Sequence, residues 1–147
     1  MNSTPDSATL VADLLARARK AGVEAADAIH VQSASLSLHR RLGKPEKLER
    51  AESADLGLRV FAGKRQAFVS STDMSAAALG ELVERALAMV KVVPEDPYCG
   101  LADPAELFRG TPPALDLVDV AEPAVETLTE RTRAAEESAL EIGRAHV

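Results

Sequence analysis

The segment Asp55–Val93 constrains the fold more than any other part of the chain, because it contains a complete pattern of strand, turn, strand and helix. Leu56, Leu58 and Val60 occupy alternate positions, as expected of a half-buried strand. Gly63 then stands first in a two-residue loop, where a type II′ hairpin turn requires a positive φ. The alternation resumes after it, so the sequence predicts a tight antiparallel hairpin.

An amphipathic helix is predicted directly after this hairpin. Thr72, Asp73 and Ser75 are its candidate N-caps, because a short side-chain oxygen can accept hydrogen bonds from the free N–H groups of a first turn. Apolar residues then recur at helical spacing, namely Leu79, Leu82, Val83, Ala86, Leu87, Val90 and Val93. One face of this helix is therefore expected to cover a sheet.

A helix and a strand are predicted before this segment. Ser7 is placed to cap the first helix, and Gly22 is a suitable residue to end it. Residues 28–40 then have a strand pattern whose phase changes, since Ile29 and Val31 are odd-numbered and the later apolar residues are even-numbered. Either a bulge interrupts the strand at residues 32–33, or both of its faces are partly covered.

The remaining elements complete a predicted α+β fold. A turn at residues 41–45 leads into a short charged edge strand over residues 46–53. Residues 94–113 form an irregular connection, and Pro123 suits the first turn of a last helix. We therefore predict a four-stranded antiparallel meander sheet, with two long helices packed on one face and a third helix leading out.

Composition excludes several classes of protein. The 147 residues suffice for one domain, and 46% hydrophobic with 27% charged residues is typical of a globular chain. Aromatic residues make up only 3%, which argues against a base-stacking surface for single-stranded nucleic acid. The start of the chain lacks a secretory pattern and no apolar run is long enough for a membrane span, so a cytoplasmic location is expected. Cys99 is the only cysteine and is interpreted as an incidental loop thiol.

Charge is distributed unevenly along the chain. The formal net charge is −6, and residues 94–147 hold 4 basic and 12 acidic residues. A basic cluster lies between the first two predicted strands, formed by Arg40, Arg41, Lys44, Lys47 and Arg50. Glu46, Glu49 and Glu52 are interleaved with it, and phosphate affinity depends on uncompensated cations. We interpret the cluster as a solvated charged hairpin and expect no nucleic-acid binding.

Residue types that could carry catalysis are present without a convincing pattern. His30 and His39 fall on opposite faces of a regular strand, and a zinc site needs three or four converging ligands. Glu136 and Glu137 are helix neighbours that point about 100° apart, so we interpret both as a solvated face. The run Ser70–Thr72 has no histidine with an acidic partner near it and is interpreted as a helix cap.

Three stretches resemble the N-terminal region of the TldD/PmbA family, and in particular its PmbA (TldE) branch. They are Ala21–Val31, Asp55–Val60 with Ser70–Asp73, and Pro94–Pro104. The acidic and aromatic Pro94-Glu95-Asp96-Pro97-Tyr98 run, bounded by prolines and placed directly after a helix, is the most specific of them. The resemblance extends to about Leu140 and covers roughly the first third of a full-length family member.

This resemblance implies a subunit of a cytoplasmic zinc metallopeptidase complex that acts on small or unfolded peptides. It implies that a TldD-type partner carries the zinc, while the PmbA-type subunit is non-catalytic. The family's His-Glu-x-x-x-His zinc motif is absent here, because His30, His39 and His146 have no adjacent Glu. The family's older name, modulator of DNA gyrase, implies a genetic connection rather than DNA binding. We thus expect no catalytic, cofactor-binding or metal-ligating residues in this chain, and no membrane partner.

The expected organisation is an α+β domain over residues 1–116, a helix over residues 117–140 leading towards a further domain, and a non-native tail over residues 141–147. The tail can be back-translated as GAG ATC GGA AGA GCA CAC GTC, which contains a widely used sequencing-adapter sequence. A free-standing protein-interaction module without enzymatic role, which binds through its acidic last helix, is the alternative to a peptidase subunit. A reading frame that continues past Leu140 would distinguish the two hypotheses.

Overall fold

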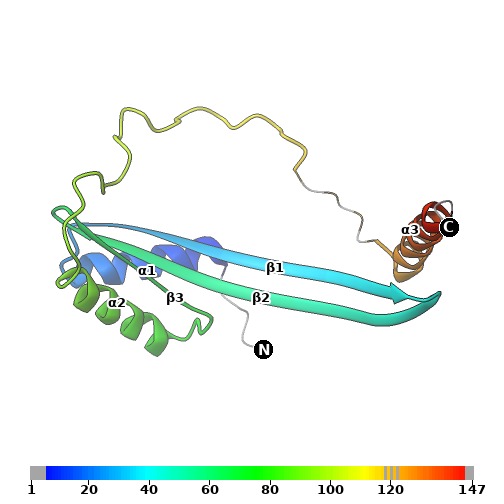
Figure 1. Ribbon diagram of the computed structural model, residues 1–147. Coiled ribbons are helices and arrows are strands. Elements are labelled where there is room, and N and C mark those ends of the chain that lie inside the picture. The colour runs from blue at the N-terminus through cyan, green and yellow to red at the C-terminus, as the bar shows by residue number, and fades with distance from the viewer. Residues whose placement is uncertain (1–5, 118, 120, 122, 145–147) are drawn as a thin grey trace. The chain divides into compact units, whose positions relative to one another are not determined.

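The computed structural model describes residues 6–117, 119, 121 and 123–144 (Figure 1). Within them the order of elements is α1 (Ser7–Lys20), β1 (Ala25–Arg41), β2 (Lys44–Ala62), β3 (Arg65–Ser71), α2 (Ala76–Val90) and α3 (Val125–Arg144). The strands form one antiparallel sheet in the order β1-β2-β3. The α+β class predicted from the sequence is therefore confirmed.

The predicted number of strands is wrong, because the described sheet has three strands and not four. Residues 46–53 and 55–61, which we predicted as separate strands, both belong to the 19-residue strand β2. Nothing between them forces a turn, because residues 46–56 contain neither glycine nor proline. Alternation also continues in one phase through Leu48, Leu56 and Leu58, so the backbone remains extended.

The chain divides into two compact units that share the long strands. The first unit combines residues up to 33 with residues 53–108, and the second combines residues 34–52 with residues from 109 onward. We call residues 34–52 the hairpin arm.

The first unit contains the main hydrophobic core, where α1 and α2 pack on one face of the sheet (Figure 1). The largest fully buried side chains are Leu14 of α1, Leu82 of α2, and Leu56, Leu58 and Val60 of β2. Ala67 and Val69 of β3 pair with Val60 and Leu58 and point to the same face. Burying each large aliphatic side chain contributes about 1.5–3 kcal/mol, so this cluster accounts for the packing of both helices.

Local signals explain where these elements begin and end. The Ser75 hydroxyl accepts a hydrogen bond from the Ala78 N–H at 3.3 Å, which identifies Ser75 as the N-cap of α2 among the three candidates. Asp6, rather than the predicted Ser7, is the N-cap residue of α1. Gly63 has φ +56° in the β2–β3 loop, as the predicted turn requires.

In the second unit, α3 contacts the hairpin arm. Its Glu136 bonds to residues at the arm's turn, and Leu36 and Leu48 of the arm line a shallow hollow with Pro123, Ala124 and Val125 at the start of α3. Leu36 and Leu38 are half-buried, whereas Ile29 and Val31 in the first unit are exposed. The phase change in the sequence thus separates an exposed pair of apolar residues in the first unit from a half-buried pair in the hairpin arm.

Candidate interaction surfaces

The metal-ligating side chains of the described residues lie apart from one another. No group of three or more His, Cys, Asp or Glu side chains within residues 6–117 and the described part of 119–144 could hold a metal ion. His30 Nδ1 lies 2.9 Å from the Ser7 hydroxyl at the start of α1, and its Nε2 is buried without a hydrogen-bond partner among the described residues. His39 belongs to the hairpin arm, and His146 lies outside the described residues. Among the described residues, His30 and His39 therefore belong to no group that could hold a metal ion.

The serine-rich run before α2 has a structural role. The Ser71 hydroxyl accepts from the Asp73 N–H at 3.0 Å, and the Asp73 carboxylate accepts from the Ser75 N–H at 2.8 Å. These short-range bonds shape the turn that leads into α2. The Ser71 hydroxyl is thus held by the backbone of the turn, and the interpretation of Ser70–Thr72 as the helix cap is wrong, because Ser75 caps α2.

Three cations of the basic cluster are paired with carboxylates of the hairpin arm. Lys47 bonds to Glu49 at 2.6 Å, Arg50 to Glu52 at 3.0 Å, and Arg41 Nη1 lies 3.8 Å from Glu46. The predicted solvated, self-compensating hairpin is therefore confirmed in these pairs. Each pair is well exposed and contributes only about 0–1 kcal/mol to stability.

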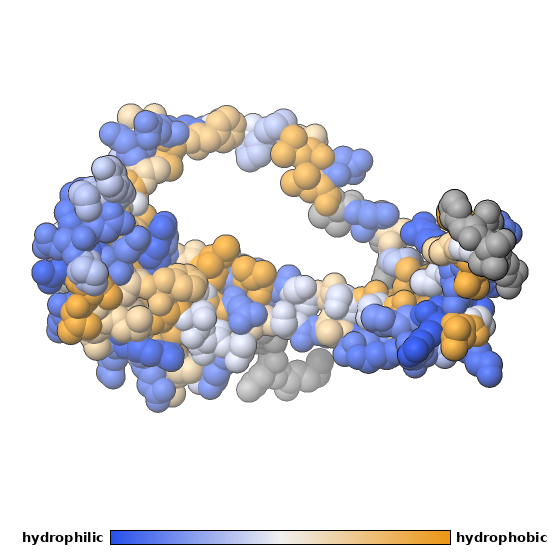
Figure 2. Space-filling view, in the orientation of Figure 1, coloured by the Kyte–Doolittle hydropathy of each residue, from blue (hydrophilic) through white to orange (hydrophobic). Residues whose placement is uncertain are grey.

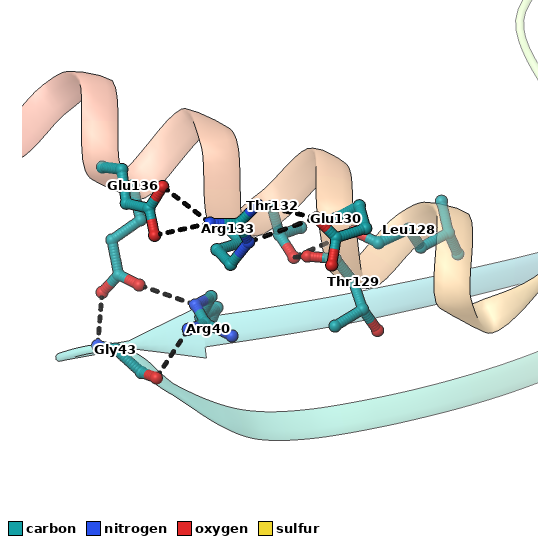
Figure 3. Close-up of polar contacts among 9 residues, drawn as sticks. Arg40, Gly43, Leu128, Thr129, Glu130, Thr132, Arg133 and Glu136 are labelled. Carbon is teal, nitrogen blue, oxygen red and sulfur yellow. Dashed lines mark hydrogen bonds and ion pairs between the residues drawn. The ribbon is translucent and has the colours of Figure 1, made fainter.

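Glu136 forms a largely buried polar contact in the second unit (Figure 3). Its carboxylate accepts from Arg40 Nε at 2.9 Å and from the Gly43 N–H at 3.0 Å, while Arg40 Nη2 donates to the Gly43 carbonyl at 2.6 Å. The side chains of Arg40 and Glu136 are only 14% and 18% exposed. We call this network of Arg40, Gly43 and Glu136 the clasp.

The clasp corrects our interpretation of Glu136 as part of a solvated face. Only Glu137 fits that interpretation, since it is 56% exposed and bonds to Arg133 one turn away. Arg133 also bonds to Glu130, and these two glutamates raise the pKa of its guanidinium. The sequence does contain a signal for the placement of Glu136. Leu128, Thr132 and Glu136 recur every four residues and so share one helix face.

The turn held by the clasp has an unusual residue at its apex. Leu42 and Gly43 have φ +50° and +77°, so both central residues of the turn are left-handed, as in a type I′ hairpin turn. Leu42 is 82% exposed. The hairpin arm therefore ends in a braced turn that presents a leucine to its surroundings.

The sheet face opposite α1 and α2 carries an apolar patch in the first unit. Ile29, Val31 and Phe68 are each about half-exposed there. A Cβ on Gly57 would meet Phe68 Cζ at 2.8 Å and Ile29 Cγ2 at 3.1 Å, so both side chains lie directly over the bare backbone of Gly57. We call this the open face.

A charged pair borders the open face. The Arg59 guanidinium bonds to both carboxylate oxygens of Asp27, with Nε to Oδ1 at 3.0 Å, and lies 5.1 Å from the centroid of the buried Phe61 ring. The hydrogen bond to Asp27 raises the pKa of Arg59. This side chain therefore remains cationic while its position is set by both partners.

The segment after α2 is fastened at one end and exposes apolar side chains beyond it. The Asp96 N–H donates to the Lys64 carbonyl at 2.7 Å, and Cys99 is buried. Tyr98, in contrast, is 95% exposed. Figure 2 shows apolar residues in orange along this connection, and the exposed ones are Val92, Leu101, Leu107, Phe108, Leu115 and Leu117. None of the described helices combines the length and apolar content needed to cross a bilayer.

Comparison with known proteins identifies the relatives of this chain. The family model for PmbA/TldA metallopeptidase domain 1 matches residues 26–90. The chain is 35% identical over 124 residues to the Metalloprotease PmbA homolog of Haemophilus influenzae. The aligned region covers 84% of this chain and 27% of that protein. It is 33% identical over 110 residues to Metalloprotease PmbA of Escherichia coli O157:H7, covering 75% of this chain and 24% of that protein. The chain thus spans about a quarter of the length of these relatives.

Two solved structures share the fold. A protein described as a modulator of DNA gyrase from Bacteroides thetaiotaomicron superposes with a TM-score of 0.72 at 23% identity, over 80% of this chain and 26% of that chain. TldE from Thermococcus kodakarensis superposes with a TM-score of 0.67 at 17% identity, over 92% of this chain and 30% of that chain. The matched residues, the identities and the fold agree, and this chain belongs to the PmbA/TldD family of metallopeptidases through a first domain of the PmbA type.

Proposed function

We propose that this chain is the N-terminal part of a PmbA/TldE-like subunit in a TldD/TldE-type zinc metallopeptidase complex. In this proposal the complex cleaves small or unfolded peptides in the cytoplasm, and the present chain supports architecture rather than chemistry. The observation that carries the proposal is the 35% identity to a Metalloprotease PmbA homolog over 84% of the chain. Similarity to TldE at the level of the fold is consistent with it.

The donor groups of this chain do not by themselves provide a zinc site. Its 147 residues contain three histidines and no His-Glu-x-x-x-His motif. A catalytic zinc site requires about three protein ligands that converge on one ion. A TldD-type homologous subunit would supply that ligand set, and this subunit would help to enclose the space in which peptides are cleaved.

Exposed apolar residues suggest where this chain contacts other parts of such a complex. Tyr98, Phe108 and Leu117 are 95%, 71% and 81% exposed, which is costly for isolated side chains of this size. They lie on a connection rather than on a rigid element, and loops carried by a scaffold often bear function. We assign the connection to contacts with neighbouring protein, and we assign the hairpin arm to contacts with the partner subunit.

The test is to co-express a full-length subunit carrying this sequence with a TldD-type homologue from the same genome. An unfolded peptide is offered as substrate to the co-purified complex and to each subunit alone. We expect cleavage by the complex only. Peptidase activity of the lone PmbA-type subunit, or full activity of the lone TldD-type subunit, would show that the supporting role is wrong.

The alternative of a free-standing interaction module is tested in the same preparation. It predicts that the TldD-type homologue does not co-purify with this subunit. Stable co-purification together with peptidase activity therefore favours the proposed subunit over the module.

A further inference from the structure

The turn of the hairpin arm combines features that its own unit does not explain. Leu42 is the first central residue of the turn and has φ +50°. A left-handed conformation costs a residue with a Cβ about 1–2 kcal/mol, and asparagine, aspartate or glycine is the usual choice at this position. Leu42 is also 82% exposed, so no burial against the described residues offsets this cost.

The turn is held rigidly despite its exposed position. Glu136 accepts from the Gly43 N–H and from Arg40, and Arg40 in turn donates to the Gly43 carbonyl (Figure 3). Both polar groups of the Gly43 backbone are therefore bonded to partly buried charged side chains. A side chain presented on such a turn loses little conformational freedom when it is bound, which favours affinity.

The surroundings of Leu42 indicate what it binds. A shallow hollow of about 370 Å³ lies beside it, lined by Arg41, Leu42, Lys44, Pro45 and Glu46. The two cations and one carboxylate leave one net positive charge in this lining. An exposed apolar side chain with a cationic rim is complementary to an apolar pocket that has carboxylates at its edge.

We propose that this tip, residues 41–44, inserts into the homologous partner subunit, where Leu42 fills an apolar pocket rimmed by carboxylates. The inference rests on the proposed function, because it takes the partner from there. A lipid surface is disfavoured, since one leucine contributes only about 1.5–3 kcal/mol on burial and a single net charge adds little. A protein pocket adds close packing around the anchor, which lipid does not.

Leu42→Asn tests the proposal because it separates binding from folding. Asparagine suits the left-handed position, so the free subunit should keep its free energy of unfolding or gain slightly. Met89→Gln is the matched control, because Met89 is an apolar residue of α2 that is 40% exposed and lies outside both the tip and the connection. Leu42→Met keeps an apolar anchor of similar volume.

The measurement is the dissociation constant of each full-length variant for the TldD-type subunit, by isothermal titration calorimetry. We expect Leu42→Asn to raise the dissociation constant at least about tenfold, as loss of a binding hot spot does, with Met89→Gln and Leu42→Met close to the unmodified subunit. A Leu42→Asn value within threefold of the unmodified subunit, or an equal increase for Met89→Gln, would overturn the role of the tip. Failure of the unmodified subunit to bind would overturn the proposed function and this inference with it.

Discussion

Gly57 illustrates how one residue shapes the open face. It lies within β2 opposite Ser70 of β3, and its φ is not positive. Glycine is therefore required here by the lack of room for a side chain and not by the backbone conformation. The Phe68 ring occupies the position that a Cβ would take, at 2.8 Å, and Ile29 approaches from the other side. A larger residue here must displace aromatic atoms that are packed against the backbone.

Gly57→Ala is expected to destabilise the chain by about 1 kcal/mol, because the added methyl group displaces the Phe68 ring. In a Phe68→Ala background the same change should be nearly neutral or stabilising, since the nearer of the two obstacles is gone and alanine loses less backbone entropy than glycine on folding. Chemical denaturation of the four chains of this double-mutant cycle measures the coupling. Equal effects of Gly57→Ala in both backgrounds would show that the ring does not constrain this position.

At the scale of elements, the clasp joins α3 to the turn of the hairpin arm. Glu136 and Glu137 are neighbours in one helix, yet the first is 18% exposed against Arg40 and the second is 56% exposed against Arg133. Charged groups removed from water depend strongly on their partners, whereas exposed ion pairs contribute little. The two glutamates are therefore a natural matched pair for an experiment.

Glu136→Ala should weaken the docking of α3 by about 1–3 kcal/mol, because it leaves the Gly43 N–H and the partly buried Arg40 without their acceptor. Glu137→Ala should cost at most about 0.5 kcal/mol. Hydrogen exchange of the Gly43 amide is the direct readout, and it should become about tenfold faster or more in the first variant only. Unchanged protection in Glu136→Ala would contradict the role assigned to the clasp.

The whole molecule consists of two units joined by continuous strands, with donor groups dispersed over both. His30 bonds to Ser7 in the first unit and His39 lies in the arm of the second. A zinc ion needs at least three converging ligands for stable binding. The expected absence of a catalytic metal is therefore a prediction about both units of this chain.

We predict that the chain retains no stoichiometric zinc after equilibration with the metal and desalting, as measured by inductively coupled plasma mass spectrometry. His30→Ala, His39→Ala is the control variant. Retention of one zinc per chain that disappears in this double variant would refute the prediction, whereas retention that persists would indicate another ligand set.

Much of this fold follows from local patterns in the sequence. Helices α1 and α2, the hairpin around Gly63 and the Ser75 cap depend on periodicity, turn chemistry and capping, which involve residues within a few positions of one another. The PmbA-type assignment likewise comes from contiguous stretches of sequence. Such features could be predicted without knowing which elements touch.

Contacts between distant residues decided the rest. Residues 44–62 form one strand because both halves continue to pair within the sheet, whereas the composition of the first half suggested a separate edge strand. Glu136 is removed from solvent because Arg40 and Gly43, more than ninety residues away in sequence, bond to it. Burial and pairing energies depend on neighbours in space, so only the tertiary structure distinguishes the glutamate of the clasp from the solvated one beside it.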